Sequence, residues 1–317
     1  MSTPPDAARF SVLDSLDAGR YDRIGASWLT DRLGRFPLLM QGPMGSALMQ
    51  YAGCEDVPAA YWNIAEPQEV IRLHSLYRAV GADIMLTNTF QASAPALARD
   101  GIGASMEDVN RAAVACARRA GTPCVIGSMG PCGLSWEEPE TSEFRAVRAA
   151  YREQAHALLD AGTHGILLET FTSLHDLQPA LTGVMDVASG MPVLVSFAVD
   201  DECRLLGDGA ELSRACKEAS GYGVASVGVN CCSLAAADAA VPLMARAVDL
   251  PISVRPNAGA PHRDDEGALV WEDLTDRFAD ACARWCDDGA SIVGGCCGTD
   301  VQVACVLSGC LEERSPQ

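Results

Sequence analysis

Short apolar segments recur along the chain, and segments with helical periodicity separate them. Each is nearly all apolar, and all but one end at Gly, Asn or Thr, as expected of parallel strands buried on both faces. The eight segments are FPLLMQG (36–42), ADIMLTN (82–88), PCVIGSMG (123–130), HGILLET (164–170), MPVLVSFAV (191–199), VASVGVN (224–230), PISVRPNAG (251–259) and SIVGG (291–295). Between them the pattern predicts amphipathic helices, for example over 67–82, 106–121 and 144–162. Eight such βα units predict an α/β fold, the (β/α)8 or TIM barrel.

The alternative architecture is an open, doubly wound sheet. Such a sheet would place a glycine-rich phosphate-binding turn after the first strand, and GPMGSAL (42–48) is a poor match to that motif. No low-complexity linker or block of charge divides the chain. We therefore expect an N-terminal helical extension over 1–35, a barrel domain over 36–310, and a short tail over 311–317.

Cysteines follow two of the apolar segments, at positions where barrel enzymes carry their chemistry. Cys231 follows the sixth segment, and Cys296 and Cys297 follow the eighth in SIVGGCCGTD. Adjacent cysteines rarely form a disulfide, and the flanking glycines allow unusual backbone conformations and close approach. Because the carboxyl ends of barrel strands share one rim, the three thiolates can converge there. Glu169 ends the fourth segment on the same rim.

Three converging thiolates predict a zinc site, because soft sulfur ligands select zinc over hard cations. Three protein ligands leave a fourth position open, as in catalytic zinc sites. The side chain of Cys232 is expected to point away from its neighbour. Two alternatives stay open: a closed structural site that includes Cys232, and no metal at all. An open position suits a substrate thiol, whose pKa the metal lowers so that the thiolate can attack a methyl group.

Composition narrows the range of partners and compartments. The net charge of −19 and the pI of about 4.5 make nucleic acid an unexpected partner, since phosphates would be repelled. The N-terminus lacks the pattern of a signal peptide, and no apolar run approaches the length of a membrane span. We therefore expect a cytoplasmic protein that does not bind membranes. Its 14 cysteines then indicate reduced thiols and a metal site rather than disulfides.

The paired cysteine motifs GVNC (228–231) and GGCCGT (294–299) resemble those of the zinc-dependent homocysteine S-methyltransferase family. This family includes betaine–homocysteine methyltransferase, S-methylmethionine-dependent enzymes and the homocysteine domain of cobalamin-dependent methionine synthase. The resemblance extends, in order, over roughly residues 36–310. It is carried by the segments 58–93, VIGSMGPCG (125–133), LLETFTSLHDL (167–177), VSFAVDDECRLLGDG (195–209) and VRPNAG (254–259).

The resemblance implies a transfer of a methyl group to the thiol of homocysteine, giving methionine. It implies that Cys231, Cys296 and Cys297 bind Zn²⁺, with the homocysteine sulfur as the fourth ligand. Glu169 would hold the ammonium group of the substrate, as a carboxylate does, and is the predicted catalytic residue. Substrate contacts are predicted for Gln41, Gly42, Met44, Gly45, Ser46, Ser128 and Glu169.

The chain departs from the family pattern at Gln41. The family usually has Asp there, within Asp-Gly-Gly-Met-Gly-Thr, and a neutral amide loses a charge-assisted contact with the ammonium. A different acceptor thiol, or a zinc-thiolate binding or sensing module without transfer activity, are therefore the alternatives. The methyl donor is expected to be a methyl-corrinoid on a separate protein, or a small onium compound such as betaine or S-methylmethionine. No folate or cobalamin module is expected within the chain.

Overall fold

The computed structural model describes residues 24–52, 57–265 and 269–314. Eight parallel strands form one sheet in the order β1-β10-β7-β6-β5-β4-β3-β2. A bridge between Met40 and Ile84, with the bond from Gln41 N to Ile84 O at 2.9 Å, joins the two edges and closes the ring. The strands are β1 (Leu38–Leu39), β2 (Ile84–Leu86), β3 (Cys124–Met129), β4 (Ile166–Phe171), β5 (Val193–Phe197), β6 (Ser226–Asn230), β7 (Ile252–Arg255) and β10 (Ala290–Val293). The predicted (β/α)8 barrel is confirmed.

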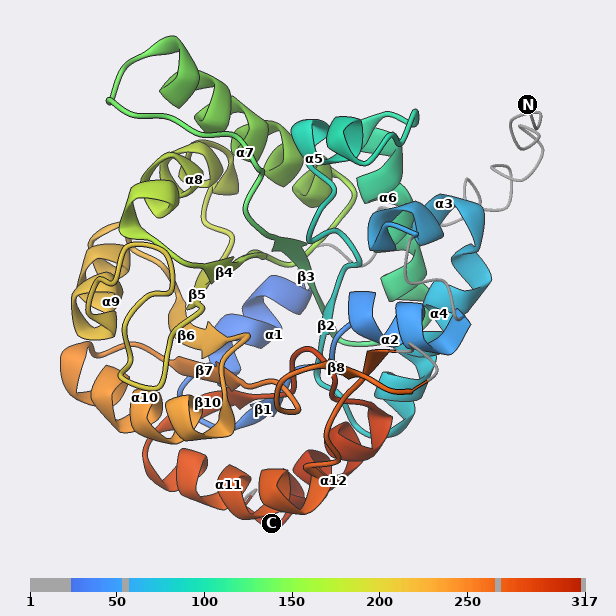
Figure 1. The fold of residues 1–317 in the computed structure, drawn as a ribbon, viewed down its shortest axis with the longest axis vertical. Coiled ribbons are helices and arrows are strands. Elements are labelled where there is room, and N and C mark those ends of the chain that lie inside the picture. Colours follow the sequence, from blue (N-terminus) through green and yellow to red (C-terminus); the bar gives the residue numbers. More distant parts are fainter. Residues whose placement is uncertain (1–23, 53–56, 266–268, 315–317) are drawn as a thin grey trace.

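Helices surround the ring of strands, as Figure 1 shows. They are α2 (Gly45–Ala52), η2 (Ala59–Tyr61), α3 (Trp62–Ala65), α4 (Pro67–Ala79), α5 (Ala94–Arg99), α6 (Met106–Arg119), α7 (Ser142–Asp160), α8 (Leu174–Ala188), α9 (Leu212–Gly221), α10 (Leu234–Ala247), α11 (Thr275–Asp287) and α12 (Val301–Glu312). A short antiparallel hairpin, β8 (His262–Arg263) with β9 (Leu269–Val270), lies between β7 and α11. No helix in the described part of the chain is long and apolar enough to cross a membrane.

Alternate residues along the strands divide the core into two layers. One set, which includes Met40, Ile126, Leu167 and Ile292, forms a small inner cluster that Leu29 of α1 (Ile24–Arg32) joins. Because the strand residues of this cluster come from six different strands of the ring and pack together, the cluster lies inside the barrel. The other set, which includes Val125, Leu168 and Val254, packs outward against the helices. Side chains that continue the inner series therefore reach the carboxyl end of the barrel from inside it.

The N-terminal extension predicted for 1–35 is described from residue 24 onward, where α1 packs against the barrel. Its first 23 residues lie outside the described part. At the other end α12 continues to Glu312, two residues past the predicted boundary at 310. The division into extension, barrel domain and tail stays a prediction.

Gly228 in β6 lies against the backbone of β7, and its replacement tests that close approach. A Cβ at this position would collide with the carbonyl oxygen of Ser253. Because a backbone atom cannot turn aside as a side chain does, we expect Gly228→Ala to lower the free energy of unfolding by about 1–3 kcal/mol in urea denaturation. Gly309→Ala is the matched control, since nothing lies within 4 Å of its added Cβ and alanine favours the α12 helix. Equal stabilities of the two variants would contradict the expectation.

Candidate metal centre

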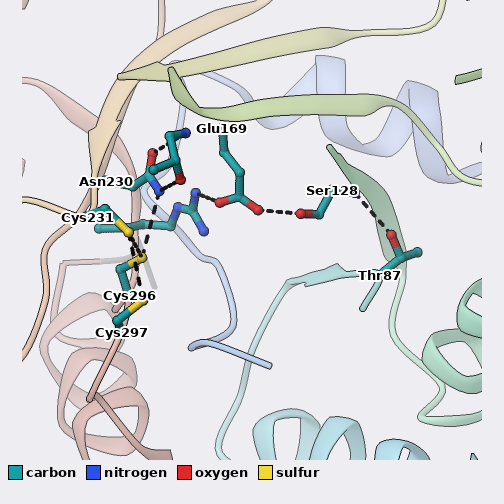
Figure 2. A network of polar contacts seen from close by, with 9 residues as sticks. Thr87, Ser128, Glu169, Asn230, Cys231, Cys296 and Cys297 are labelled. Carbon is teal, nitrogen blue, oxygen red and sulfur yellow. Dashed lines mark hydrogen bonds and ion pairs between the residues drawn. The ribbon is translucent and has the colours of Figure 1, made fainter. Parts of the chain in front are cut away.

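Three cysteine sulfurs meet at the carboxyl end of the barrel. Cys231 directly follows β6, while Cys296 and Cys297 lie in the loop between β10 and α12. The Sγ of Cys231 lies 3.3 Å from that of Cys296 and 3.8 Å from that of Cys297, and all three atoms lie within 4.8 Å of one another. Figure 2 shows the three side chains pointing toward one another. The structure thus brings together the three cysteines that the sequence singled out.

The backbone around these sulfurs is shaped to aim them. Cys231 has a φ of 53°, in the left-handed region that non-glycine residues seldom occupy. The loop of Cys296 and Cys297 is tied to the residues that follow β7 by two bonds, from Cys296 N to Pro256 O at 2.8 Å and from Ala258 N to Cys297 O at 3.0 Å. These contacts fix two separate chain segments relative to each other before any ligand binds.

Cys232 is buried next to Cys231 but does not join the cluster. Among the described residues, the group whose ligand atoms converge contains Cys231, Cys296 and Cys297 without Cys232. The left-handed turn at Cys231 sends the following residue elsewhere, and the Cys232 carbonyl accepts a bond from Asn257 N at 2.9 Å. The geometry therefore favours three thiolate ligands over a closed set of four.

The three thiols share their protons unequally. Hydrogen bonds from Cys231 and Cys297, followed by the positive charge of Arg255, hold the pKa of Cys296 well below its ordinary value. The same contact with Cys296 is the main cause that raises the pKa of Cys231. A metal ion that binds all three sulfurs must therefore displace protons, which makes binding dependent on pH.

Asn230 connects the sulfurs to β4. Its Nδ2 donates to Thr170 Oγ1 at 2.8 Å and lies 3.7 Å from the Sγ of Cys296, while its Oδ1 accepts from Thr170 N at 3.0 Å. Thr170, like Cys231, has a positive φ, of 63°. A fully buried amide thus holds two residues of unfavourable backbone conformation next to each other.

Glu169 and Arg255 form a buried ion pair inside the barrel mouth. Arg255 Nη2 donates to Glu169 Oε2, and Ser128 Oγ donates to Glu169 Oε1. Both charged side chains are nearly inaccessible, with relative exposures of 4% for Arg255 and 9% for Glu169. Figure 2 shows the resulting line of polar groups from the cysteines through Glu169 to Ser128 and Thr87. The predicted residues Glu169 and Ser128 thus touch each other.

Arg255 is the residue of this group that reasoning from the sequence missed. It lies in PISVRPNAG, where a single cation ends an apolar run. A charged residue in a buried strand is rare unless it is paired, so its presence in this apolar segment indicates a buried ion pair. Its partner could not be identified in the same way, because β4 and β7 are far apart in the chain and are not neighbours in the ring.

Gln41 follows β1 and is directed to the outer layer of the barrel. Its Oε1 lies 3.0 Å from Nδ1 of His74 in α4, and both residues are fully buried. Leu39, two residues earlier, also packs in the outer layer. Because Oε1 can only accept, the histidine proton lies on Nδ1. The predicted contact between Gln41 and substrate stays a prediction, since its carbonyl oxygen already has this partner.

The other residues predicted to contact substrate surround the turn into α2. Gly42 lies against the ring of Tyr77, whose hydroxyl donates to Pro43 O at 3.1 Å. Met44 is buried, and Gly45 and Ser46 begin α2. Ser46 Oγ accepts a bond from Gly298 N at 3.3 Å, next to Cys297. This turn therefore adjoins the cysteine loop, while its contact with a substrate stays a prediction.

His74 gives the fold a dependence on pH that can be measured. Burial lowers the pKa of His74 from 6.5 to about 3. As the pH falls below 6.5, His74 is therefore protonated in the unfolded chain while it stays neutral in the folded chain. Stability from this group is therefore present above pH 6.5 and is lost as the pH falls toward 3. Between pH 7 and pH 5 we expect a loss of about 2 kcal/mol in the free energy of unfolding. Urea denaturation at both pH values measures it.

His74→Asn is the comparison, because the asparagine amide can still donate to Gln41 but does not titrate. Its own stability at pH 7 is expected to fall, and the quantity of interest is the change between the two pH values. That change should be smaller than in the wild type by about 2 kcal/mol. An identical change in both proteins would show that His74 is not the titrating group.

The chain is similar to known proteins in sequence and in fold. The family model for homocysteine S-methyltransferase matches residues 38–303. The chain belongs to the homocysteine S-methyltransferase family. It is 30% identical to the methionine synthase of Mycobacterium leprae (strain TN) over 320 residues, which cover 91% of this chain and 26% of that protein. The chain thus spans about a quarter of the length of that relative.

Two further comparisons involve proteins of similar size. The homocysteine S-methyltransferase of Escherichia coli (strain K12) is 30% identical over 290 residues, covering 83% of this chain and 91% of the relative. The crystal structure of the homocysteine methyltransferase MmuM from Escherichia coli, in its metallated form, superposes with a TM-score of 0.73 at 25% identity. That match covers 92% of this chain and the whole of the other.

Proposed function

We propose that this member of the family is a zinc-dependent S-methyltransferase whose methyl acceptor is the thiol of homocysteine and whose product is methionine. The observation that carries the proposal is the convergence of three sulfurs at the carboxyl end of a barrel whose sequence matches this family. This end of the strands is where barrel enzymes carry their reacting groups. The existence of a metallated form of the related MmuM supports the binding of a metal by this member of the family.

The donor set fits zinc. In a tetrahedral site with Zn–S bonds of about 2.3 Å, two sulfurs lie about 3.8 Å apart. The observed separations of 3.3 and 3.8 Å need little adjustment to reach that arrangement. Zinc bound by three thiolates would accept the acceptor sulfur as a fourth ligand and keep it as a thiolate at neutral pH.

The residues of the chain would then orient the acceptor for an in-line attack. A new S–C bond forms to the methyl carbon as the bond between that carbon and the donor breaks, and the donor leaves with the electron pair. Asn230, at the end of β6, would hold the Cys296 sulfur in place. The catalytic role predicted for Glu169, binding of the ammonium group, stays a prediction; within the protein its two oxygens bond Ser128 and Arg255.

The methyl donor is proposed to be either a methyl-corrinoid on a separate protein or a small onium compound. Similarity to a methionine synthase supports the first, and similarity to a homocysteine S-methyltransferase of comparable length supports the second. A protein-bound donor and a small cation would reach the same three sulfurs, so one assay can compare them.

The test is methionine formation by zinc-loaded protein from homocysteine and a panel of donors: S-methylmethionine, betaine, and a methyl-corrinoid protein. We expect at least one donor to give methionine, and stripping zinc with a chelator to abolish the reaction. The matched control is protein reloaded with zinc after stripping, which should recover the activity. Protein that binds one zinc per chain but forms no methionine with any donor would contradict the proposal and favour a zinc-thiolate binding module.

A further inference from the structure

The barrel strands carry two charged side chains, and these two neutralise each other. Across the residues of the eight strands, Glu169 in β4 and Arg255 in β7 are the charged members. Both continue the inner series of side chains, since their neighbours Leu168 and Val254 pack in the outer layer. They form a buried ion pair, so the strand residues place no net charge in the barrel mouth.

Each oxygen of the Glu169 carboxylate has a partner within the protein. Arg255 binds one oxygen and Ser128 binds the other. Ser128 is itself held, because its backbone N–H donates to Thr87 Oγ1 at 3.0 Å and its carbonyl accepts from Thr89 Oγ1 at 2.7 Å. An ammonium group would therefore meet a carboxylate whose charge Arg255 already balances, and its own loss of hydration would be poorly offset.

Gln41 offers no second anchor for an ammonium group. It is neutral, its carbonyl oxygen is bonded to His74, and burial keeps His74 neutral as well. Arg255 retains an unused donor, since its Nε has no hydrogen-bond partner within the described residues. A guanidinium with a spare donor suits a carboxylate and repels an ammonium.

We propose that Arg255 is a specificity-determining residue that withdraws Glu169 from ammonium recognition, so that the site accepts short aliphatic thiols bearing a carboxylate whether or not they carry an α-ammonium group. The inference rests on the proposed function, because it concerns the acceptor of the same site. Arg255 acts through Glu169 and is thus a positioning residue. Homocysteine remains an acceptor, and its amino group adds little to its affinity.

The test compares the affinity of zinc-loaded protein for L-homocysteine and for 4-mercaptobutanoate, which differ by the amino group alone. Calorimetry measures both without a methyl donor. We expect the two dissociation constants to agree within about threefold, whereas a working ammonium–carboxylate contact would separate them by about tenfold to a hundredfold. A preference for homocysteine of tenfold or more in the wild type overturns the inference and leaves the proposed function intact.

Variants at Arg255 test whether this residue is the reason that the two thiols bind with similar affinity. Arg255→Gln releases Glu169 and should raise the preference for homocysteine to about tenfold or more. Arg255→Lys keeps the charge and should behave as the wild type, a rescue that a merely structural role would not produce. Arg284→Gln, which breaks the exposed pair with Asp238, is the matched control and should leave the preference unchanged.

The outcomes separate the two proposals. If folded, zinc-loaded wild type binds neither thiol, the proposed function is contradicted and the inference falls with it. If both thiols bind but Arg255→Gln shows the wild-type ratio, Arg255 does not set the preference and the inference is overturned. Should Arg255→Gln fail to fold, the wild-type ratio together with Arg255→Lys still decides, because a tenfold preference in either protein contradicts the proposal.

Discussion

Replacement of Cys231 by serine is expected to abolish both stoichiometric zinc binding and methyl transfer. Cys231 supplies the one sulfur of the cluster that directly follows β6, and the other two are neighbours in a single loop. A serine hydroxyl does not ionise at neutral pH and is a poor ligand for a soft site. Substitution of a residue that contacts a metal ligand typically lowers activity by roughly 10–100-fold, and the loss in Cys231→Ser should be larger. Metal analysis after gel filtration and the methionine assay measure the two effects.

Cys305→Ser is the matched control, because Cys305 is exposed on α12 and lies outside the sulfur cluster. Its zinc content and activity should equal those of the wild type. Zinc retained at one equivalent per chain by Cys231→Ser, with unchanged activity, would show that the three sulfurs are not the metal ligands. Loss of zinc in both variants would indicate general damage by thiol replacement rather than the loss of a ligand.

The fold could be predicted because its signals are local and repeated. Each barrel strand falls within one residue of an apolar segment chosen from the sequence, and α4, α6 and α7 begin within two residues of the predicted helices. The convergence of the cysteines followed from the same pattern, since parallel strands of a closed ring end on one rim. Residues at strand ends thus become neighbours in space although 65 positions separate Cys231 from Cys296.

What could not be predicted depends on side-chain direction and on pairing across the ring. Gln41 follows a strand of two residues, so the pattern did not show that its amide contacts His74 in the outer layer. The pair of Arg255 with Glu169 joins strands that are not adjacent in the sheet. The periodicity of apolar residues indicates which residues are buried. It does not indicate which buried charged residues form an ion pair with each other.

The positive φ angles at Thr170 and Cys231 could not be predicted from the sequence either. Left-handed backbone is usually signalled by Gly or Asn, and neither residue type occupies these positions. Each costs of order 1–3 kcal/mol and persists where neighbouring contacts hold it. Asn230 provides those contacts, because its side chain bonds both the N–H and the hydroxyl of Thr170 while its own backbone leads into Cys231. The polar contacts around the sulfurs therefore keep unfavourable local conformations in place.

Asn230→Asp is expected to weaken zinc binding by about 10–100-fold with little change in side-chain shape. The acceptor oxygen that receives the Thr170 N–H is preserved, but the donor that faces Thr170 Oγ1 and the Cys296 sulfur becomes an oxygen. A carboxylate next to a thiolate is repelled, and the repulsion is strong because Asn230 is fully buried. Competition with a chromophoric zinc chelator measures the affinity.

Thr170→Val separates the charge from the hydrogen-bond network. Valine keeps the branched shape and the backbone N–H of Thr170, and removes only the hydroxyl that accepts from Asn230. The contact between Asn230 and the Cys296 sulfur survives in that variant, so its zinc affinity should fall by less than about threefold. Equal losses in the two variants would mean that the network, and not the amide facing the sulfur, controls the metal. Wild-type affinity in Asn230→Asp would show that Asn230 does not tune the thiolates at all.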